Sequence, residues 1–248
     1  MISVVLAAGY ATRLYPITEN FPKPLLDVGG VSILDRLLSD VDSIPEITRH
    51  VVVSNQRFFA HFEKWEQGAA LKKPVTLLND GSTQNENRLG AVRDVRVAME
   101  SASLDDDLMV LAGDNLLDFS LRALSDFFGQ VDGSVIMCYA EPDPAVLRRC
   151  GVAQLSEQGR VISMQEKPAQ PASHWAVPPF YIYKRRDLPL VGRAIDEGLN
   201  VDAPGSFISY LCAHAPVYAL KMPGARYDVG DIASYNRVRA QYGQPPVG

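Results

Sequence analysis

The sequence has few of the residues that support disulfide frameworks, nucleic-acid binding or membrane insertion. Its 248 residues include three cysteines, Cys138, Cys150 and Cys212, whose wide spacing matches no C-x-x-C motif and whose odd number closes no disulfide framework. Acidic residues outnumber basic ones by 29 to 24, which disfavours bulk electrostatic binding to nucleic acid or to an anionic membrane. The apolar start, MISVVLAAG, has no basic residue and is too short for a signal peptide or a membrane span. We therefore expect a cytoplasmic protein with no nucleic-acid and no membrane partner.

Two common kinds of site are also missing from the sequence. The phosphate-binding pattern G-x-x-x-x-G-K-[ST] does not occur, and G-x-G-x-x-G fails in the opening loop because position 11 is alanine. The four histidines show no i, i+4 pairing and have no neighbouring cysteine, so they do not indicate a zinc site. Each is expected at the surface or at a helix cap: His50, His61, His174 and His214.

The first half of the chain alternates short β-branched runs with amphipathic segments, which is typical of βαβ units. Apolar residues recur at helical spacing over 33–41, and Ser32 before them fits an N-cap. Ligands of open α/β sheets bind at the carboxyl ends of the parallel strands, so the loops after these strands should share one rim. The predicted strands are 2–6, 50–55, 75–80 and 107–113.

The second half predicts that antiparallel strands join this sheet. Gln158-Gly159 separates two alternating runs within 151–167, which indicates a hairpin turn, and Asp231 fits the N-cap of a final helix that ends at Gly243. Further strands are predicted at 133–140, 178–184 and 217–222. We predict an α/β fold with a Rossmann-like mixed, mostly parallel sheet flanked by helices, in a single domain over 1–248.

The loop after the first predicted strand has features of an anion-binding site. Ala7, Ala8 and Gly9 are small and let backbone N–H groups approach a ligand closely. Arg13 offers a planar fork of donors suited to phosphate oxygens, and Lys23, held between two prolines, adds a point charge.

This loop resembles a known family. The stretch LAAGYATRLYPITENFPKPLLDVGG is similar to the signature L-A-A-G-x-G-T-R-L-x-P-x-T-x-x-x-P-K-P-L-x-x-V of the sugar-1-phosphate nucleotidyltransferases, and most similar to the short glucose-1-phosphate thymidylyl- and uridylyltransferases. The resemblance implies a nucleotide-binding half at 1–130 and an acceptor-binding half at 131–248. It also implies that Arg13 and Lys23 act on the triphosphate of an NTP. The nucleoside would be embraced by Leu6, Ala7, Ala8 and Gly9.

Two aspartates are expected to hold Mg²⁺. Asp114 follows the predicted strand 107–113, and a carboxylate at a strand's carboxyl end suits a hard cation. Asp228, in GARYDVGDIASY, is similar to the family's second magnesium ligand in the motif W-x-D-x-G-T. The neighbours of Asp114 also receive roles from the resemblance, Gly113 on the nucleotide side and Asn115 on the acceptor side.

A third segment, VISMQEKP, is expected at the acceptor site. Glu166 and Lys167 read as neighbours in a strand, so their side chains should point to opposite faces. The family that this sequence resembles has the same Glu-Lys-Pro. There the lysine is a catalytic group that contacts the phosphate of the sugar phosphate, and the glutamate contacts a sugar hydroxyl. Gly151 resembles the glycine whose backbone lines the sugar site.

The polar segment DGSTQNENRLGAVRD is expected to contact the base. A Leu-Gly-small segment packs on the base in the resembling family, so Leu89 and Gly90 are candidates, together with Gln84. An ordinary surface loop is the alternative.

One part of the acceptor site departs from the family pattern. Pro178 and Pro179 stand where a flexible glycine is usual, and they remove two backbone donors. The acceptor is therefore open between a sugar 1-phosphate and another phosphorylated sugar, polyol or alcohol. For the nucleotide, dTTP or UTP is favoured, with cytidylyl or guanylyl transfer as the alternative. A non-catalytic NTP-binding regulator is the alternative from another class, and the sequence leaves the oligomeric state open.

Overall fold

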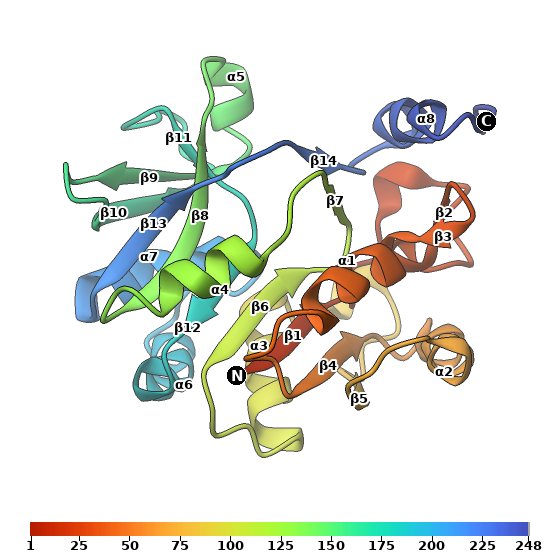
Figure 1. Cartoon of the computed structure of the whole chain (residues 1–248), viewed down its shortest axis with the longest axis horizontal. Helices are drawn as coiled ribbons and strands as arrows, with labels where there is room; N and C mark the ends of the chain where they lie inside the picture. The colour runs from red at the N-terminus through yellow and green to blue at the C-terminus, as the bar shows by residue number, and fades with distance from the viewer. Residues whose placement is uncertain (248) are drawn as a thin grey trace.

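The computed structural model describes residues 1–247, which form a ten-stranded mixed sheet with helices on both faces (Figure 1). Its strand order is β10-β9-β11-β8-β12-β6-β1-β4-β5, with β13 paired to β8. The α/β class is confirmed. Four of the strands are the predicted parallel ones, within one residue of their expected bounds: β1 (Ile2–Leu6), β4 (Arg49–Ser54), β5 (Val75–Asn79) and β6 (Leu108–Ala112).

The other strands come from the second half of the chain and are mostly antiparallel to their neighbours. β9 and β10 form the predicted hairpin, with Gly159 at φ 78° in its turn. β12 joins this group to β6, so a single sheet runs through both halves. The bounds are β8 (Ser134–Ala140), β9 (Gly151–Leu155), β10 (Val161–Glu166), β11 (Trp175–Val177), β12 (Phe180–Tyr183) and β13 (Val217–Lys221).

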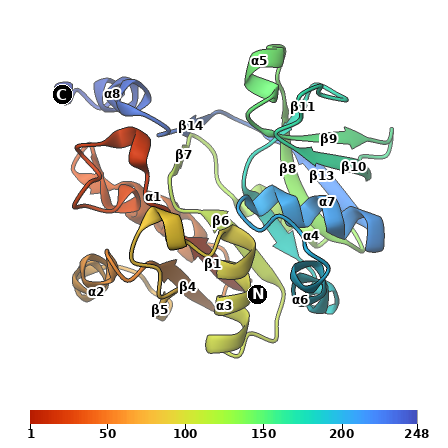
Figure 2. The same ribbon diagram turned by 180° about the vertical axis from the view of Figure 1, so that it is seen from behind.

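Helices cover both faces of the sheet and form two apolar cores with it (Figures 1 and 2). One face carries α1 (Ile33–Asp42), α2 (Phe59–Gly68) and α4 (Arg122–Phe128), and the other carries α3 (Ala91–Ser101), α6 (Pro189–Asp196) and α7 (Pro204–His214). The Ser32 side chain caps α1 by accepting the Asp35 N–H at 3.0 Å, as predicted. Within residues 1–247, no helix has the length and apolar character needed to cross a bilayer.

A small two-stranded sheet joins the carboxyl-terminal region to the rim of the main sheet. β14 (Arg226–Asp228) pairs antiparallel with β7 (Asn115–Leu117), and the register sets Asp228 opposite Asn115. The predicted final helix, α8 (Ile232–Gln241), follows with Asp231 as its N-cap. It packs over the hairpin of β2 (Asp27–Val28) and β3 (Val31–Ser32), while α5 (Pro144–Leu147) lies at the far end of β8 (Figure 1).

The expectation that every histidine lies at the surface or at a cap is wrong for His50. Its ring is fully buried and is hydrogen-bonded to Ser3 Oγ at 2.7 Å and to Asp42 Oδ1 at 3.1 Å. Its partners come from β1 and α1, so strand and helix packing satisfies both ring nitrogens at once, which no local spacing reveals. His174 and His214 are exposed, as expected.

Asp94, on the first turn of α3, is a buried carboxylic acid without a hydrogen-bond partner for Oδ1 in residues 1–247. Burial, and secondarily the charge of Asp80, raises the pKa of Asp94 from 3.8 to about 8. The folded protein therefore keeps a proton on Asp94 at neutral pH, whereas the unfolded chain releases it.

This difference predicts a stability that falls as pH rises from about pH 4 to about pH 8, because the unfolded state then binds fewer protons than the folded state. We expect Asp94→Asn to raise the free energy of unfolding relative to the parent, by a margin that is on the order of 4 kcal/mol larger at about pH 8 than at about pH 5. Urea titrations at both pH values measure it. The exposed Asp196→Asn is the matched control, and equal margins at the two pH values would contradict the prediction.

Candidate active site

The loop after β1 is held in place by backbone and amide contacts to the neighbouring strand. Ala7 N–H donates to Val53 O at 2.8 Å, and Asn55 Nδ2 donates to Ala8 O at 2.9 Å. Ala11 adopts a left-handed conformation, φ 46° and ψ 42°, and its methyl group packs at the edge of the apolar cluster under α8. The residue that stands where the signature has glycine thus uses the backbone conformation that glycine favours.

This loop lines a cavity of about 160 Å³ at the rim of the sheet. Arg13 is exposed beside it and has no ion-pair or hydrogen-bond partner within residues 1–247, so its guanidinium is available to a ligand. The sequence-predicted residues in the lining are Leu6, Ala7, Gly9, Arg13, Lys23 and Asp114.

A second cavity, of about 290 Å³, lies between the rim and the strands of the second half. It is called the acceptor cavity below, because the residues expected at the acceptor site line it. It shares Ala112 and Asp114 with the first cavity, so the two meet at the end of β6. The sequence-predicted residues in its lining are Asp114, Asn115, Gly151, Glu166, Lys167 and Asp228.

An ion-pair cluster marks the junction of the two cavities. Lys23 Nζ lies 2.7 Å from Asp114 Oδ2 and 3.8 Å from Asp228 Oδ1, and the Lys23 side chain is 9% exposed. Asn115 Nδ2 donates to the other oxygen of Asp114 at 2.7 Å. The β7–β14 pairing therefore brings the two predicted metal-binding carboxylates to one ammonium group.

The chemistry of this cluster suits a magnesium ion. Asp114 and Asp228 converge on one point, and Mg²⁺ typically binds one or two carboxylates and takes its remaining ligands from phosphates and waters. Residues 1–247 contain no group of three or more His, Cys, Asp or Glu side chains arranged to hold a metal, so the protein offers a pair and not a complete cage. Both features fit a metal that is shared with a phosphorylated ligand.

The prediction that Glu166 and Lys167 both lie in a strand and point to opposite faces is wrong. β10 ends at Glu166, and Lys167 is left-handed at φ 47°, which breaks the strand alternation and lets both residues line the same cavity. Burial raises the pKa of Glu166 against the opposing effect of the Lys167 charge. The Glu166 carboxylate fits against Gly151 and Gly205, where added Cβ atoms would contact it.

The remaining predicted residues are not in the linings of the two cavities. Gly113 is buried between β6 and Asp114, and Ala8 is buried within the opening loop. Gln84 is exposed and begins a short 3-10 turn, with Leu89 and Gly90 after it.

The predicted base-contacting segment is joined to the wall of the acceptor cavity. Gly90 has φ 89°, and a Cβ atom there would lie 2.6 Å from Val201 O. Arg88 Nε forms an ion pair with Asp202 Oδ1 at 2.8 Å, and Asp202 lines the acceptor cavity.

Several residues of the acceptor cavity were not identified from the sequence: Arg149, Tyr181, Asp202 and Arg226. For Arg226 a signal was present, because it occupies the position of the tryptophan in W-x-D-x-G-T. The others carry no motif, and their place in the wall depends on how the second half packs.

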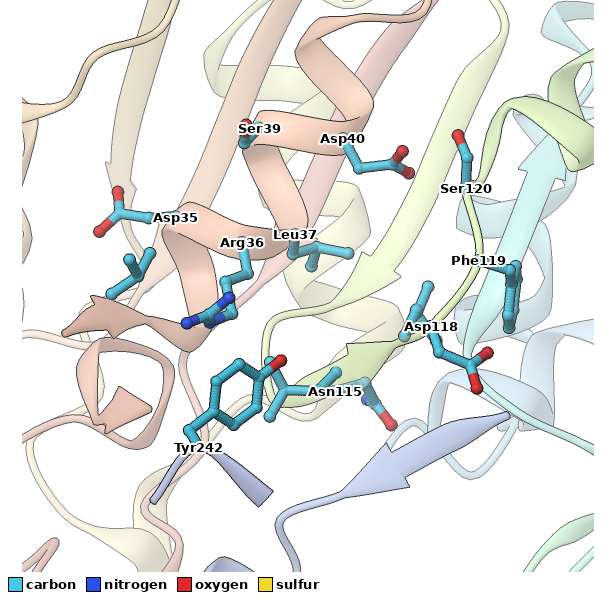
Figure 3. Close-up of a pocket in the computed structure, with 13 residues that line it drawn as sticks. Asp35, Arg36, Leu37, Ser39, Asp40, Asn115, Asp118, Phe119, Ser120 and Tyr242 are labelled. Carbon is cyan, nitrogen blue, oxygen red and sulfur yellow. The ribbon is translucent and has the colours of Figure 1, made fainter. Parts of the chain in front are cut away.

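A separate cavity of about 590 Å³ lies on the α1 side of β7 (Figure 3). Arg36 and Tyr242 lie close together there, with the guanidinium carbon 4.4 Å from the ring centroid. Other polar residues of the lining are Asp35, Ser39, Asp40, Asp118 and Ser120. Asn115 borders both this cavity and the acceptor cavity.

Comparisons with solved structures show that the chain shares a known fold. A putative glucose-1-phosphate thymidylyltransferase from Bacillus anthracis has the same fold, with a TM-score of 0.80 at 20% identity over 100% of this chain and 98% of its own. A UDP-glucose pyrophosphorylase in complex with UDP-glucose gives a TM-score of 0.83 at 17% identity, covering 98% of both chains. The fold is that of nucleotidyltransferases.

The chain belongs to the nucleotidyl transferase family, whose model matches residues 2–244. Two curated relatives are 29% identical: the bifunctional protein GlmU of Methanococcus aeolicus, over 70% of this chain, and the glucose-1-phosphate thymidylyltransferase of Neisseria meningitidis, over 75%. The chain spans 38% and 62% of the lengths of these relatives.

The left-handed Ala11 generates a prediction for the opening loop. Ala11→Gly should relieve roughly 1 kcal/mol of backbone strain and lose a similar free energy from the packed methyl group, so stability should change by less than about 1 kcal/mol and nucleotide binding should persist. Ala11→Val should lower stability by about 2 kcal/mol, because a β-branched residue is disfavoured at positive φ. Thermal unfolding and nucleotide titration measure both. A large loss of binding in the glycine variant would show that the Ala11 methyl group itself is needed.

Proposed function

We propose that the chain transfers a nucleoside monophosphate from an NTP to a sugar 1-phosphate such as glucose 1-phosphate and releases pyrophosphate. The observation that carries this proposal is the Lys23 ammonium between Asp114 and Asp228, at the junction of the two cavities. An NTP in one cavity and a phosphorylated acceptor in the other would meet with their phosphates at this cluster. Membership of the nucleotidyl transferase family supports the same reaction.

The reaction needs no nucleophile from the protein. A phosphate oxygen of the acceptor attacks the α-phosphorus, a new P–O bond forms, and the bond between the α-phosphorus and the bridging oxygen breaks, so that this oxygen leaves with the pyrophosphate. A phosphomonoester has a second pKa of about 6 and is largely dianionic at neutral pH, so a general base is not required. Catalysis then consists of positioning two anions and neutralising their charge.

The cationic residues would share this task. Arg13, which has no protein partner within residues 1–247, would bind the triphosphate together with Lys23, and the exposed Lys167 would hold the acceptor phosphate in line. Mg²⁺ held by Asp114 and Asp228 would neutralise the phosphates of both substrates.

The remaining assignments follow the two cavities. Asn115, Gly151 and Glu166 would bind the acceptor, with the Glu166 carboxylate accepting from a hydroxyl. The nucleoside would be bound by Leu6, Ala7, Ala8, Gly9, Gln84, Leu89, Gly90 and Gly113.

For the nucleotide we favour dTTP or UTP, because the thymidylyltransferase of Neisseria meningitidis and the UDP-glucose pyrophosphorylase are among the similar proteins. CTP or GTP with another phosphorylated sugar, polyol or alcohol is the alternative. Pro178 and Pro179 bear on this choice, since both line the acceptor cavity and neither supplies a backbone donor.

A pyrophosphate-release assay tests the proposal. The protein is incubated with Mg²⁺, each NTP or dTTP, and a panel of phosphorylated sugars, polyols and alcohols. Asp114→Asn controls for a contaminating enzyme. Release with one substrate pair, abolished in the control variant, is expected. No release across the panel, combined with NTP binding by calorimetry, would favour a non-catalytic regulator.

Arg13→Ala should lower kcat/KM by on the order of 3 kcal/mol with the productive substrate pair, because it removes one donor to charge that develops in the transition state. Steady-state kinetics measure this effect. Arg122→Ala removes the same charge from the exposed face of α4 and should leave kcat/KM unchanged. Near-parental turnover in Arg13→Ala would remove Arg13 from the mechanism.

A further inference from the structure

The acceptor cavity contains a guanidinium group whose charge the protein does not match. Arg226 opens β14, its side chain is 15% exposed, and it lines this cavity. Its hydrogen bond within residues 1–247 goes to a neutral group, Asn115 Oδ1, at 2.7 Å. Only one carboxylate in the described chain comes within 4.0 Å, that of Asp228, and at 3.9 Å it is beyond hydrogen-bond distance.

Such a group favours an anionic ligand. A guanidinium carries five N–H donors and stays charged at all ordinary pH values, and charges removed from water are normally paired. Tyr139 and Cys150 lie close enough that the Arg226 charge opposes the effect of burial, which raises the pKa of both. These side chains do not neutralise the cation.

Other charges around the cavity are already engaged. Asp202 is paired with Arg88, and Asp114 and Asp228 face Lys23. Glu166 forms no ion pair with Arg226 within residues 1–247, and burial raises the pKa of its carboxyl group. The exposed Arg149 and Lys167 add positive charge to the same lining.

The residue type at position 226 differs from that of the family motif. Arg226 stands where the motif W-x-D-x-G-T has tryptophan, whose indole is apolar with a single N–H donor. A planar cationic fork at this position changes the chemistry of the cavity from apolar contact to recognition of paired anionic oxygens.

We infer that Arg226 binds an anionic oxygen group of the acceptor, an inference that rests on the proposed function for the identity of this cavity. Two sources supply that chemistry: the phosphate of the acceptor, or a carboxylate elsewhere on it. Arg226 is then a specificity-determining residue of this chain and distinguishes its acceptor site from one that carries tryptophan.

Calorimetric titration without NTP tests the inference with two probes, glucose 1-phosphate and glucuronic acid 1-phosphate, which differ by one carboxylate. We compare the parent, Arg226→Met, Arg226→Lys and the control Arg148→Met, which removes a charge outside the cavity lining. Arg226→Met should weaken binding about tenfold or more, Arg226→Lys should recover part of the loss, and the control should not change it.

Each outcome has one meaning. Equal losses for both probes assign Arg226 to the phosphate, and a loss confined to glucuronic acid 1-phosphate assigns it to a carboxylate. Unchanged affinity for both probes, or no binding of either probe by the parent, would overturn the inference. The titration measures binding and not turnover, so the two proposals can fail separately. Binding that depends on Arg226, without pyrophosphate release, would contradict only the proposed function. Pyrophosphate release, with binding that does not depend on Arg226, would contradict only this inference.

A purely structural role is separated by kinetics. Arg226 also orients Asn115, which donates to Asp114, so a structural role would disturb the nucleotide and metal side of the site. With the productive pair, Arg226→Met should raise KM for the acceptor about tenfold and change KM for the NTP less than about threefold. Comparable changes in both KM values would count against direct binding of the acceptor.

Discussion

The ion pair between Lys23 and Asp114 is the interaction on which the site depends. The lysine is almost fully buried, and its ammonium lies 2.7 Å from one carboxylate and 3.8 Å from that of Asp228. It joins the opening loop, the end of β6 and the start of the carboxyl-terminal region, segments far apart in the chain. Removing Asp114 would leave the Lys23 ammonium, on a side chain that is only 9% exposed, without its partner at 2.7 Å.

The two cavities that meet at this cluster have different chemistry. The cavity proposed for the nucleotide is built from small residues and backbone at the ends of parallel strands, with Arg13 unpaired in the described chain. The cavity proposed for the acceptor has several charged side chains in its lining, among them Glu166, Lys167 and Arg226. Because both cavities include Asp114, the phosphates of ligands bound in them would meet close to the cluster of Lys23, Asp114 and Asp228.

Much of the framework was predictable from local pattern. The parallel strands, the Ser32 cap and the hairpin with Gly159 follow from periodicity, capping chemistry and turn preference, which act over a few residues. Lys167 was not predictable in this way, since its left-handed conformation interrupts an alternating run without a glycine or asparagine to signal it. The prediction for His50 was wrong for another reason, because its hydrogen-bond partners belong to other elements.

The sequence by itself determined the fold class, the opening loop and which residue types could meet phosphate and metal, because these depend on short-range order and on motifs that can be read in the chain. Only the tertiary structure decided which of those residues share a cavity. The β7–β14 register brought Asp228 to Asp114, and the packing of the second half turned Arg226 into the acceptor cavity. Tertiary packing also buried Asp94 on α3, whose Oδ1 has no hydrogen-bond partner within residues 1–247. Burial and charge compensation depend on contacts between distant segments, which local periodicity does not encode.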